Sequence, residues 1–301
     1  AVGGSLLRLD GSGAKRLHTG CRIIDPDYSC IRQHSYTAEY NDVALEILNY
    51  KTGSKGRFFY ADSQAVGTDG IDLDSIVFKG GRWVARGVFA RNANFDPWNG
   101  NIATVYNRIR WVSIRDMIWD FGEEEHDDTS LDSFVKFDDV DDWEVVNVTE
   151  HHTVPGTLGT SDDTNESVIT VGKCNTGKII NCRFDGFIKG AGDEPSPHKD
   201  TAVTDKNQFF CRHLLIENTT CGQNAQIDNY VANACWFDHL EIVNCDAKNV
   251  VGIGSGGSRC VIDNVNGNST EATRRSGQRI TIRGSNCRIH TSWADNKGAI
   301  V

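Results

Sequence analysis

The chain has 301 residues, of which 39% are hydrophobic and 24% charged, so it can bury the core of one large domain or of two ordinary ones. A formal net charge of −10 argues against nonspecific nucleic-acid binding, which needs a basic face. We find no run of about 18 apolar residues and therefore predict that no helix spans a membrane.

The first 65 residues are less regular than the rest and predict either an N-terminal cap or early turns of a repetitive fold. From there on, short β-branched segments recur, each followed by Asn or Asp. Aligning six of them on that polar residue gives one column at spacings of 31, 34, 37, 26 and 20 residues. The column consists of Asp116, Asn147, Asn181, Asn218, Asn244 and Asn264.

A repeat of this length, built from short strands, is typical of a solenoid, and parallel strands stacked about 4.8 Å apart fit it. Asn tolerates the left-handed conformation at a tight corner, and stacked Asn amides can hydrogen-bond along the stack. Cys182 and Cys245 each follow a column Asn and are predicted to point inward. An antiparallel β-sandwich with Asn-Gly hairpins is the alternative, but it does not explain the recurring column.

Three longer inserts, 122–132, 153–166 and 190–207, leave successive repeats and are expected to cluster on one side of the stack. Loops on a rigid scaffold are the usual place for a site. After Asn218 the repeats become shorter, and that part of the chain is predicted to be plain scaffold.

Four segments then carry a resemblance: HKDTAV (198–203), CRHLLIENTTCG (211–222), AQ (225–226) and GIGSGGSRCVIDN (252–264). In order and approximate spacing they resemble the pectate-lyase-like right-handed parallel β-helix superfamily, which includes polysaccharide lyases, glycoside hydrolases and phage tailspike depolymerases. His198 and Asp200 match that family's first motif, whereas Thr201 and Val203 replace its Gly and Gln.

The resemblance implies an all-β, single-stranded right-handed parallel β-helix over residues 66–301 with corner inserts, preceded by a cap or early turns over 1–65. It implies recognition and cleavage of a polysaccharide or cell-surface glycan, by a lyase or a glycoside hydrolase. The setting would be a phage tailspike-like virion appendage, a homotrimer that is attached to other virion proteins. The alternatives are a non-catalytic receptor-binding or structural β-helix of a virion or cell surface, and a secreted enzyme, although the Gly-His-Gly signature of plant polygalacturonases is absent.

Two groups of side chains are candidates for catalysis and binding. His198 or Lys199 could act as the base toward a uronic acid, and Asp200 could orient His198; Gln226 and Asp228 might line the same groove. The alternatives are a solvated loop and a polar turn.

Asp120, His151 and Asp185 form the second group, since each lies four residues after a column residue. If the repeats stack without shifts, they form a row about 5 Å apart. The two carboxylates would then be about 10 Å apart, close to the separation in inverting glycosidases. An ordinary Asp-Gly corner at Asp185 is the alternative.

No cofactor and no metal site are predicted. The acidic runs 123–128 and 138–142 could offer oxygen ligands to Ca²⁺, but a solvated acidic face is the favoured interpretation. Tryptophans such as Trp119 and Trp143 could stack on sugars or fill the interior.

Overall fold

The structure is a computed structural model of the whole chain. The residues that it describes are 7–9, 15–24, 29–33, 37–48, 57–61, 74–85, 93–95, 109–122, 135–137, 140–152, 167–171, 174–185, 187–190, 210–221, 226–228, 236–246, 249–251, 259–263, 269–271, 279–283 and 289–290.

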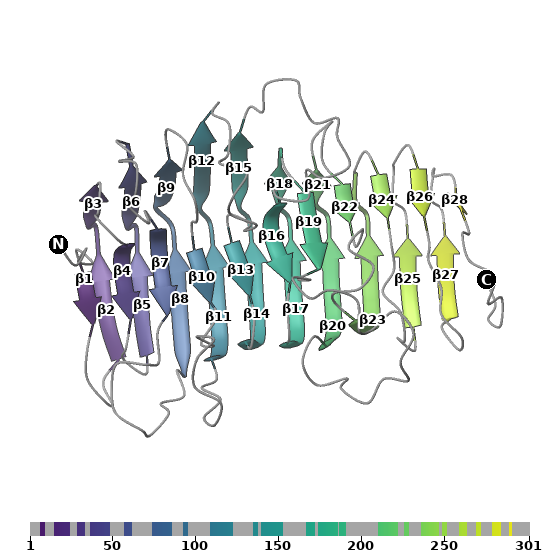
Figure 1. Cartoon of the computed structure of the whole chain (residues 1–301), viewed down its shortest axis with the longest axis horizontal. Coiled ribbons are helices and arrows are strands. Elements are labelled where there is room, and N and C mark those ends of the chain that lie inside the picture. Colours follow the sequence, from purple (N-terminus) through teal and green to yellow (C-terminus); the bar gives the residue numbers. More distant parts are fainter. Residues whose placement is uncertain are drawn as a thin grey trace, which may run out of the picture.

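All elements of the described part are β-strands, and they form three sheets in which each strand pairs in parallel with its neighbours (Figure 1). Sheet A has 11 strands: β1 (Leu7–Leu9), β4 (Ser29–Gln33), β7 (Arg57–Ala61), β10 (Ala93–Phe95), β13 (Val135–Phe137), β16 (Ser167–Val171), β19 (Phe187–Gly190), β22 (Gln226–Asp228), β24 (Asn249–Val251), β26 (Ser269–Glu271) and β28 (Ile289–His290). Sheet B has 10 strands: β2 (Lys15–Thr19), β5 (Thr37–Asn41), β8 (Ser75–Lys79), β11 (Ile109–Arg115), β14 (Val140–Val146), β17 (Cys174–Ile180), β20 (Phe210–Glu217), β23 (Trp236–Val243), β25 (Arg259–Asp263) and β27 (Arg279–Arg283). Sheet C has 7 strands: β3 (Arg22–Ile24), β6 (Ala44–Ile47), β9 (Arg82–Ala85), β12 (Ile118–Gly122), β15 (Thr149–His152), β18 (Arg183–Phe184) and β21 (Thr220–Cys221).

The chain visits the three sheets in turn, so that β11, β12 and β13 lie in sheets B, C and A, and β14 returns to sheet B beside β11. We call one such pass a rung. This all-β arrangement of parallel strands is compatible with the predicted parallel β-helix. The described strands of residues 1–65 lie in the same three sheets as the later ones, and the predicted boundary at residue 65 stays a prediction.

The corner between sheets B and C explains the Asn column. The five column residues that the structure describes have φ between 49° and 56°, the left-handed conformation in which Asn and Asp are least strained; Asn264 lies outside the described residues. Their backbone N–H groups donate to the next rung: Asp116 to the carbonyl of Val146, and Asn147 to that of Ile180, both at 3.0 Å. The strand ladder thus continues through the corner without a break. The predicted side-chain ladder is present at one step, where Asn147 Nδ2 donates to Asp116 Oδ1 at 2.9 Å.

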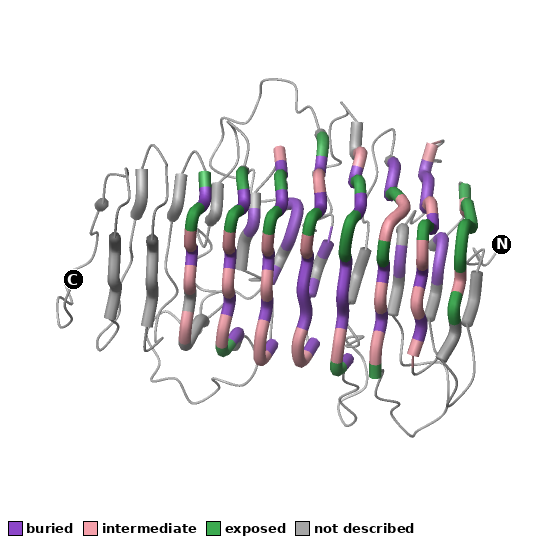
Figure 2. The backbone as a smooth tube through the Cα atoms, turned by 180° about the vertical axis from the view of Figure 1, so that it is seen from behind, coloured by how far each residue is buried: buried purple, intermediate pink, exposed green. Residues whose placement is uncertain are grey.

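The interior is filled by side chains that alternate along the strands (Figure 2). On β11, Val112 and Ile114 are buried and Arg115 is exposed, which is the period of two expected of a strand with one buried face. Cys182 and Cys245 are buried, as predicted. Aromatic rings stack between rungs inside: Trp83 on Trp119 at 5.4 Å and Phe137 on Trp143 at 4.1 Å between centroids. For Trp119 and Trp143, the interior alternative is therefore the correct one.

The shrinking repeat has a simple origin. The last strand of sheet C is β21, and beyond it the described strands alternate between sheets A and B alone. A rung without a sheet C strand needs fewer residues, so the column spacing falls after Asn218. Within the described ranges, the chain has no helix with the length and apolar character needed to cross a membrane.

Candidate functional site

Polar side chains form a row along the outer face of sheet C. Glu46 on β6 is in register with Val84 on β9, Val84 with Asp120 on β12, and Asp120 with His151 on β15. Asp185 follows β18 on the next rung. The structure therefore brings Asp120, His151 and Asp185 together on consecutive rungs, as counting from the Asn column predicts. Their catalytic and substrate-binding roles stay predictions.

His151 and Asp185 form the closest pair of this row. The Nδ1 atom of His151 lies 3.5 Å from Oδ2 of Asp185, within ion-pair distance. The His151 side chain is 54% exposed and that of Asp185 is 34% exposed, so both can meet a ligand from solvent. Asp120 is half-buried on the other side of His151. Two strand spacings put the two carboxylates about 10 Å apart.

A buried carboxylate supports this pair from inside. Glu150 lies in register with Trp119, and its side chain is fully buried among the interior aromatic rings. Its Oε2 atom accepts a hydrogen bond of 2.8 Å from the backbone N–H of Asp185. Glu150 thus fixes the backbone at the residue whose side chain faces His151. This support was not predicted, because the sequence gives no reason for a Glu to occupy an inward position.

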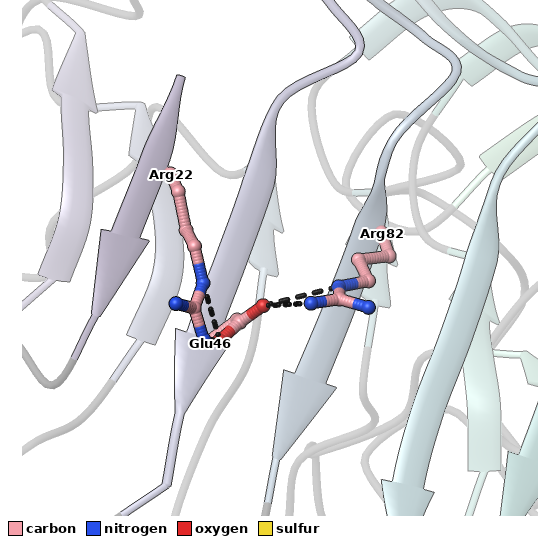
Figure 3. Close-up of polar contacts among 3 residues, drawn as sticks. All are labelled: Arg22, Glu46 and Arg82. Atoms are coloured by element: carbon pink, nitrogen blue, oxygen red, sulfur yellow. Dashed lines mark hydrogen bonds and ion pairs between the residues drawn. The ribbon is translucent and has the colours of Figure 1, made fainter. Parts of the chain in front are cut away.

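The same face carries an ion-pair cluster near the N-terminal end of sheet C (Figure 3). Glu46 lies between two arginines from the flanking strands, Arg22 on β3 and Arg82 on β9. Each carboxylate oxygen accepts two hydrogen bonds from one guanidinium, at 3.0 and 2.5 Å from Arg22 and at 3.0 and 2.7 Å from Arg82. These bonds hold the pKa of Glu46 below its usual value, although burial acts in the opposite direction. We call these three residues the Glu46 clamp.

A second outward row runs beside the first one, two residues earlier on each strand. It contains Ile118, Thr149 and Arg183, which are in register on β12, β15 and β18. Ile118 is 53% exposed, an unusual position for a large apolar side chain, and Arg183 is exposed as well. The two rows together present apolar, cationic and anionic groups next to one another along the stack.

The other predicted site residues do not join this face within the described structure. His198, Lys199 and Asp200 lie outside the described residues, as do the insert 190–207 and the acidic run 123–128. Gln226 and Asp228 lie on β22, a strand of sheet A that pairs with β19 and β24.

Sequence reasoning missed one cluster on the outer face of sheet B. His213 on β20 and His239 on β23 are in register, with ring centroids 4.6 Å apart. Nε2 of His239 lies 2.5 Å from Oε1 of Glu241. Burial lowers the pKa of His213, and the neighbouring His239 lowers it further. The signal was available, since each histidine lies five residues before a column Asn, at Asn218 and Asn244.

We call His213, His239 and Glu241 the imidazole cluster. One ligand atom from each residue can be chosen so that all lie within 4.8 Å of one another. Comparisons of the chain with protein-family models, with curated proteins and with solved structures each find no match.

Proposed function

We propose that the protein binds a linear carbohydrate polymer along the outer face of sheet C and cleaves it beside His151 and Asp185. The observation that carries this proposal is the exposed His151–Asp185 pair with Asp120 in register next to it. A row that follows the stacking direction can contact several successive units of a polymer. The exposed Ile118 offers an apolar surface to a sugar ring, and Arg183 offers hydrogen-bond donors to hydroxyl or carboxylate groups.

The chemistry would be proton transfer. A carboxylate next to Nδ1 of a histidine favours the tautomer in which that nitrogen carries the proton, and Nε2 is then the basic atom. In this role Asp185 orients His151, which takes a proton from the sugar or from a water. Asp120 would be the second carboxyl group, on the far side of His151, and its distance from Asp185 leaves room for a sugar ring or a water.

We further infer that the three sheets wind as a single-stranded right-handed parallel β-helix of the pectate-lyase-like kind. The cyclic order of the sheets and the right-handed preference of crossovers between parallel strands support this winding. A virion appendage, assembled as a homotrimer that binds a cell-surface glycan, would be the setting of such an enzyme.

The test is incubation of the full chain with a panel of neutral and acidic capsular polysaccharides, followed by size-exclusion chromatography. Cleavage lowers the polymer size. A lyase also raises ultraviolet absorbance through a new unsaturated sugar, whereas a hydrolase gives new reducing ends without that rise. His151→Ala should slow cleavage by about a hundredfold or more, the usual contribution of a general base, and Asp185→Asn should slow it less.

Asp74→Asn is the matched control, because Asp74 is an exposed carboxylate in an ion pair of 3.3 Å with Arg110, remote from sheet C. It should leave the cleavage rate unchanged. Unchanged polymer size with every substrate would refute cleavage. Glycan binding that His151→Ala weakens, without turnover, would instead support the non-catalytic alternative on the same face.

A further inference from the structure

We propose that the imidazole cluster, His213, His239 and Glu241, binds a divalent transition-metal ion of the zinc class and links strands β20 and β23. This inference is independent of the proposed function, since the cluster lies on sheet B and the His151–Asp185 pair belongs to the rungs of sheet C.

The geometry brings three suitable ligands to one place. Parallel pairing puts His213 directly opposite His239, and Glu241 lies two residues later on the same outward face of β23. The Nε2 atoms of both histidines are buried from solvent, and neither makes a hydrogen bond. Nε2 of His239 is only 2.5 Å from a carboxylate oxygen of Glu241, yet the contact lacks hydrogen-bond geometry. Buried imidazole nitrogens without hydrogen bonds are rare unless another partner is intended.

Two imidazoles and one carboxylate are a known zinc ligand set, usually with a fourth position left for water or substrate. Bonds of about 2.0–2.1 Å in tetrahedral geometry place ligand atoms roughly 3.3 Å apart. The three atoms here, all within 4.8 Å of one another, need only small adjustments. The His239–Glu241 contact must open by somewhat less than about 1 Å, which rotation of the half-buried Glu241 side chain can provide.

The surroundings suit the ion in one respect and oppose it in another. Histidine must be neutral to bind a metal, and burial favours the neutral form of His213. Lys178, on the neighbouring strand β17 and in register with Leu215, adds positive charge that weakens cation binding. The carboxylate of Glu241 offsets that charge directly at the site.

A bound ion would have a structural consequence. It would connect two adjacent rungs through side chains, at the point where sheet C ends and each rung is held by sheets A and B alone. Because only the folded chain brings the three ligands together, the metal would also stabilise the fold in proportion to its concentration.

The experiment uses the full chain after treatment with a chelator and dialysis. Zn²⁺ is titrated by calorimetry, with Ca²⁺ and Mg²⁺ in parallel, and the thermal unfolding midpoint is measured with and without Zn²⁺. We expect one Zn²⁺ per chain, a higher midpoint with Zn²⁺, and no comparable effect of Ca²⁺ or Mg²⁺. His213→Ala and His239→Ala should each weaken Zn²⁺ binding at least about tenfold, since even changes to groups behind metal ligands have effects of that size.

His151→Ala is the control variant, because it removes an exposed histidine that is not part of the cluster, and it should bind Zn²⁺ like the parent. Circular dichroism checks that each variant is folded. Replacing Zn²⁺ with Co²⁺ gives a second measurement, as visible absorption of a low-coordinate Co²⁺ site should appear in the parent and vanish in His213→Ala. Absence of stoichiometric Zn²⁺ binding, or equal binding by the folded His213→Ala and His239→Ala variants, would overturn the proposal.

Discussion

At the scale of single residues, the outer face of sheet C carries one carboxylate that is nearly removed from water. Glu46 is 2% exposed, whereas the two arginines that bind it keep more than half of their side-chain surface in solvent. A buried carboxylate is stable only when its oxygens are satisfied, and here four charge-assisted hydrogen bonds do so. The Glu46 clamp therefore holds three rungs together without an apolar contact.

Glu46→Gln tests the clamp. We expect it to lower the free energy of unfolding at pH 7 by about 1–2 kcal/mol, because charge-assisted hydrogen bonds are lost but the arginines regain water. The pKa of Glu46 is lowered in the folded state, so its contribution is complete above the ordinary carboxyl pKa and is lost as the pH falls through the folded value. The difference between parent and variant in urea unfolding should thus shrink on acidification below about pH 4.5.

Asp74→Asn is the comparison for this measurement as well. The Asp74–Arg110 pair is exposed on both sides, and its loss should change the free energy of unfolding by less than about 0.5 kcal/mol at any pH. Equal effects of the two variants at pH 7 would contradict the structural importance of the burial of Glu46.

The residues of sheet C also show what the sequence can predict. Asp120, His151 and Asp185 were found by counting four residues from Asp116, Asn147 and Asn181, because the corner fixes the register of whatever follows it. Glu46 follows Asp42 by the same count, but the next corner residue is Gly80 rather than Asn or Asp. A glycine satisfies the left-handed corner equally well, so the column becomes invisible in the sequence although the geometry is unchanged.

At the scale of elements, one strand depends on a missing side chain. Gly177 on β17 is in register with Trp143 on β14, and a Cβ atom at Gly177 would lie 2.6 Å from Cε2 of that ring. Trp143 is fully buried and stacked on Phe137, so it cannot move aside. A residue with low strand propensity is therefore required here for packing.

Gly177→Ala should destabilise the protein by about 1–3 kcal/mol, the usual effect of overpacking a close-packed core, as measured by urea unfolding. Trp143→Phe alone should also destabilise it, by leaving a cavity. In the double variant the smaller ring makes room for the alanine methyl group, so the combined loss should be smaller than the sum of the two single losses. Additive losses would show that the ring and the glycine are not coupled.

The elements that the sequence predicted well are those next to the corner. Strands of sheet B such as β11 and β14 end at a column residue and alternate apolar with polar side chains, so both their position and their buried face could be found. Strands of sheet A such as β10 and β13 are three residues long and follow inserts of variable length. A segment that short carries no detectable period, and its place is fixed by backbone pairing with the neighbouring rungs alone.

At the scale of the whole molecule, no rung can bury its core alone. Every interior side chain is covered by the rungs on either side, as Trp119 is by Trp83 and Phe184 at 5.4 and 6.0 Å between centroids. Stability in such a stack comes from contacts between neighbours, and access to the interior requires that neighbouring rungs separate. Buried thiols report on such separation.

Cys182 and Cys245 provide this measurement, because burial raises the pKa of Cys182 to about 12 and that of Cys245 to about 11. Against an ordinary value near 9, these shifts lower the thiolate fraction about a thousandfold and a hundredfold, and only the thiolate reacts with iodoacetamide. Site-resolved mass spectrometry at pH 8 should find both cysteines unmodified in the native protein and modified in urea. The exposed Cys21 is the internal control and should react under both conditions. Rapid native labelling of Cys182 would mean that the rungs separate readily, and labelling of Cys245 alone would place the weaker contacts where sheet C has ended.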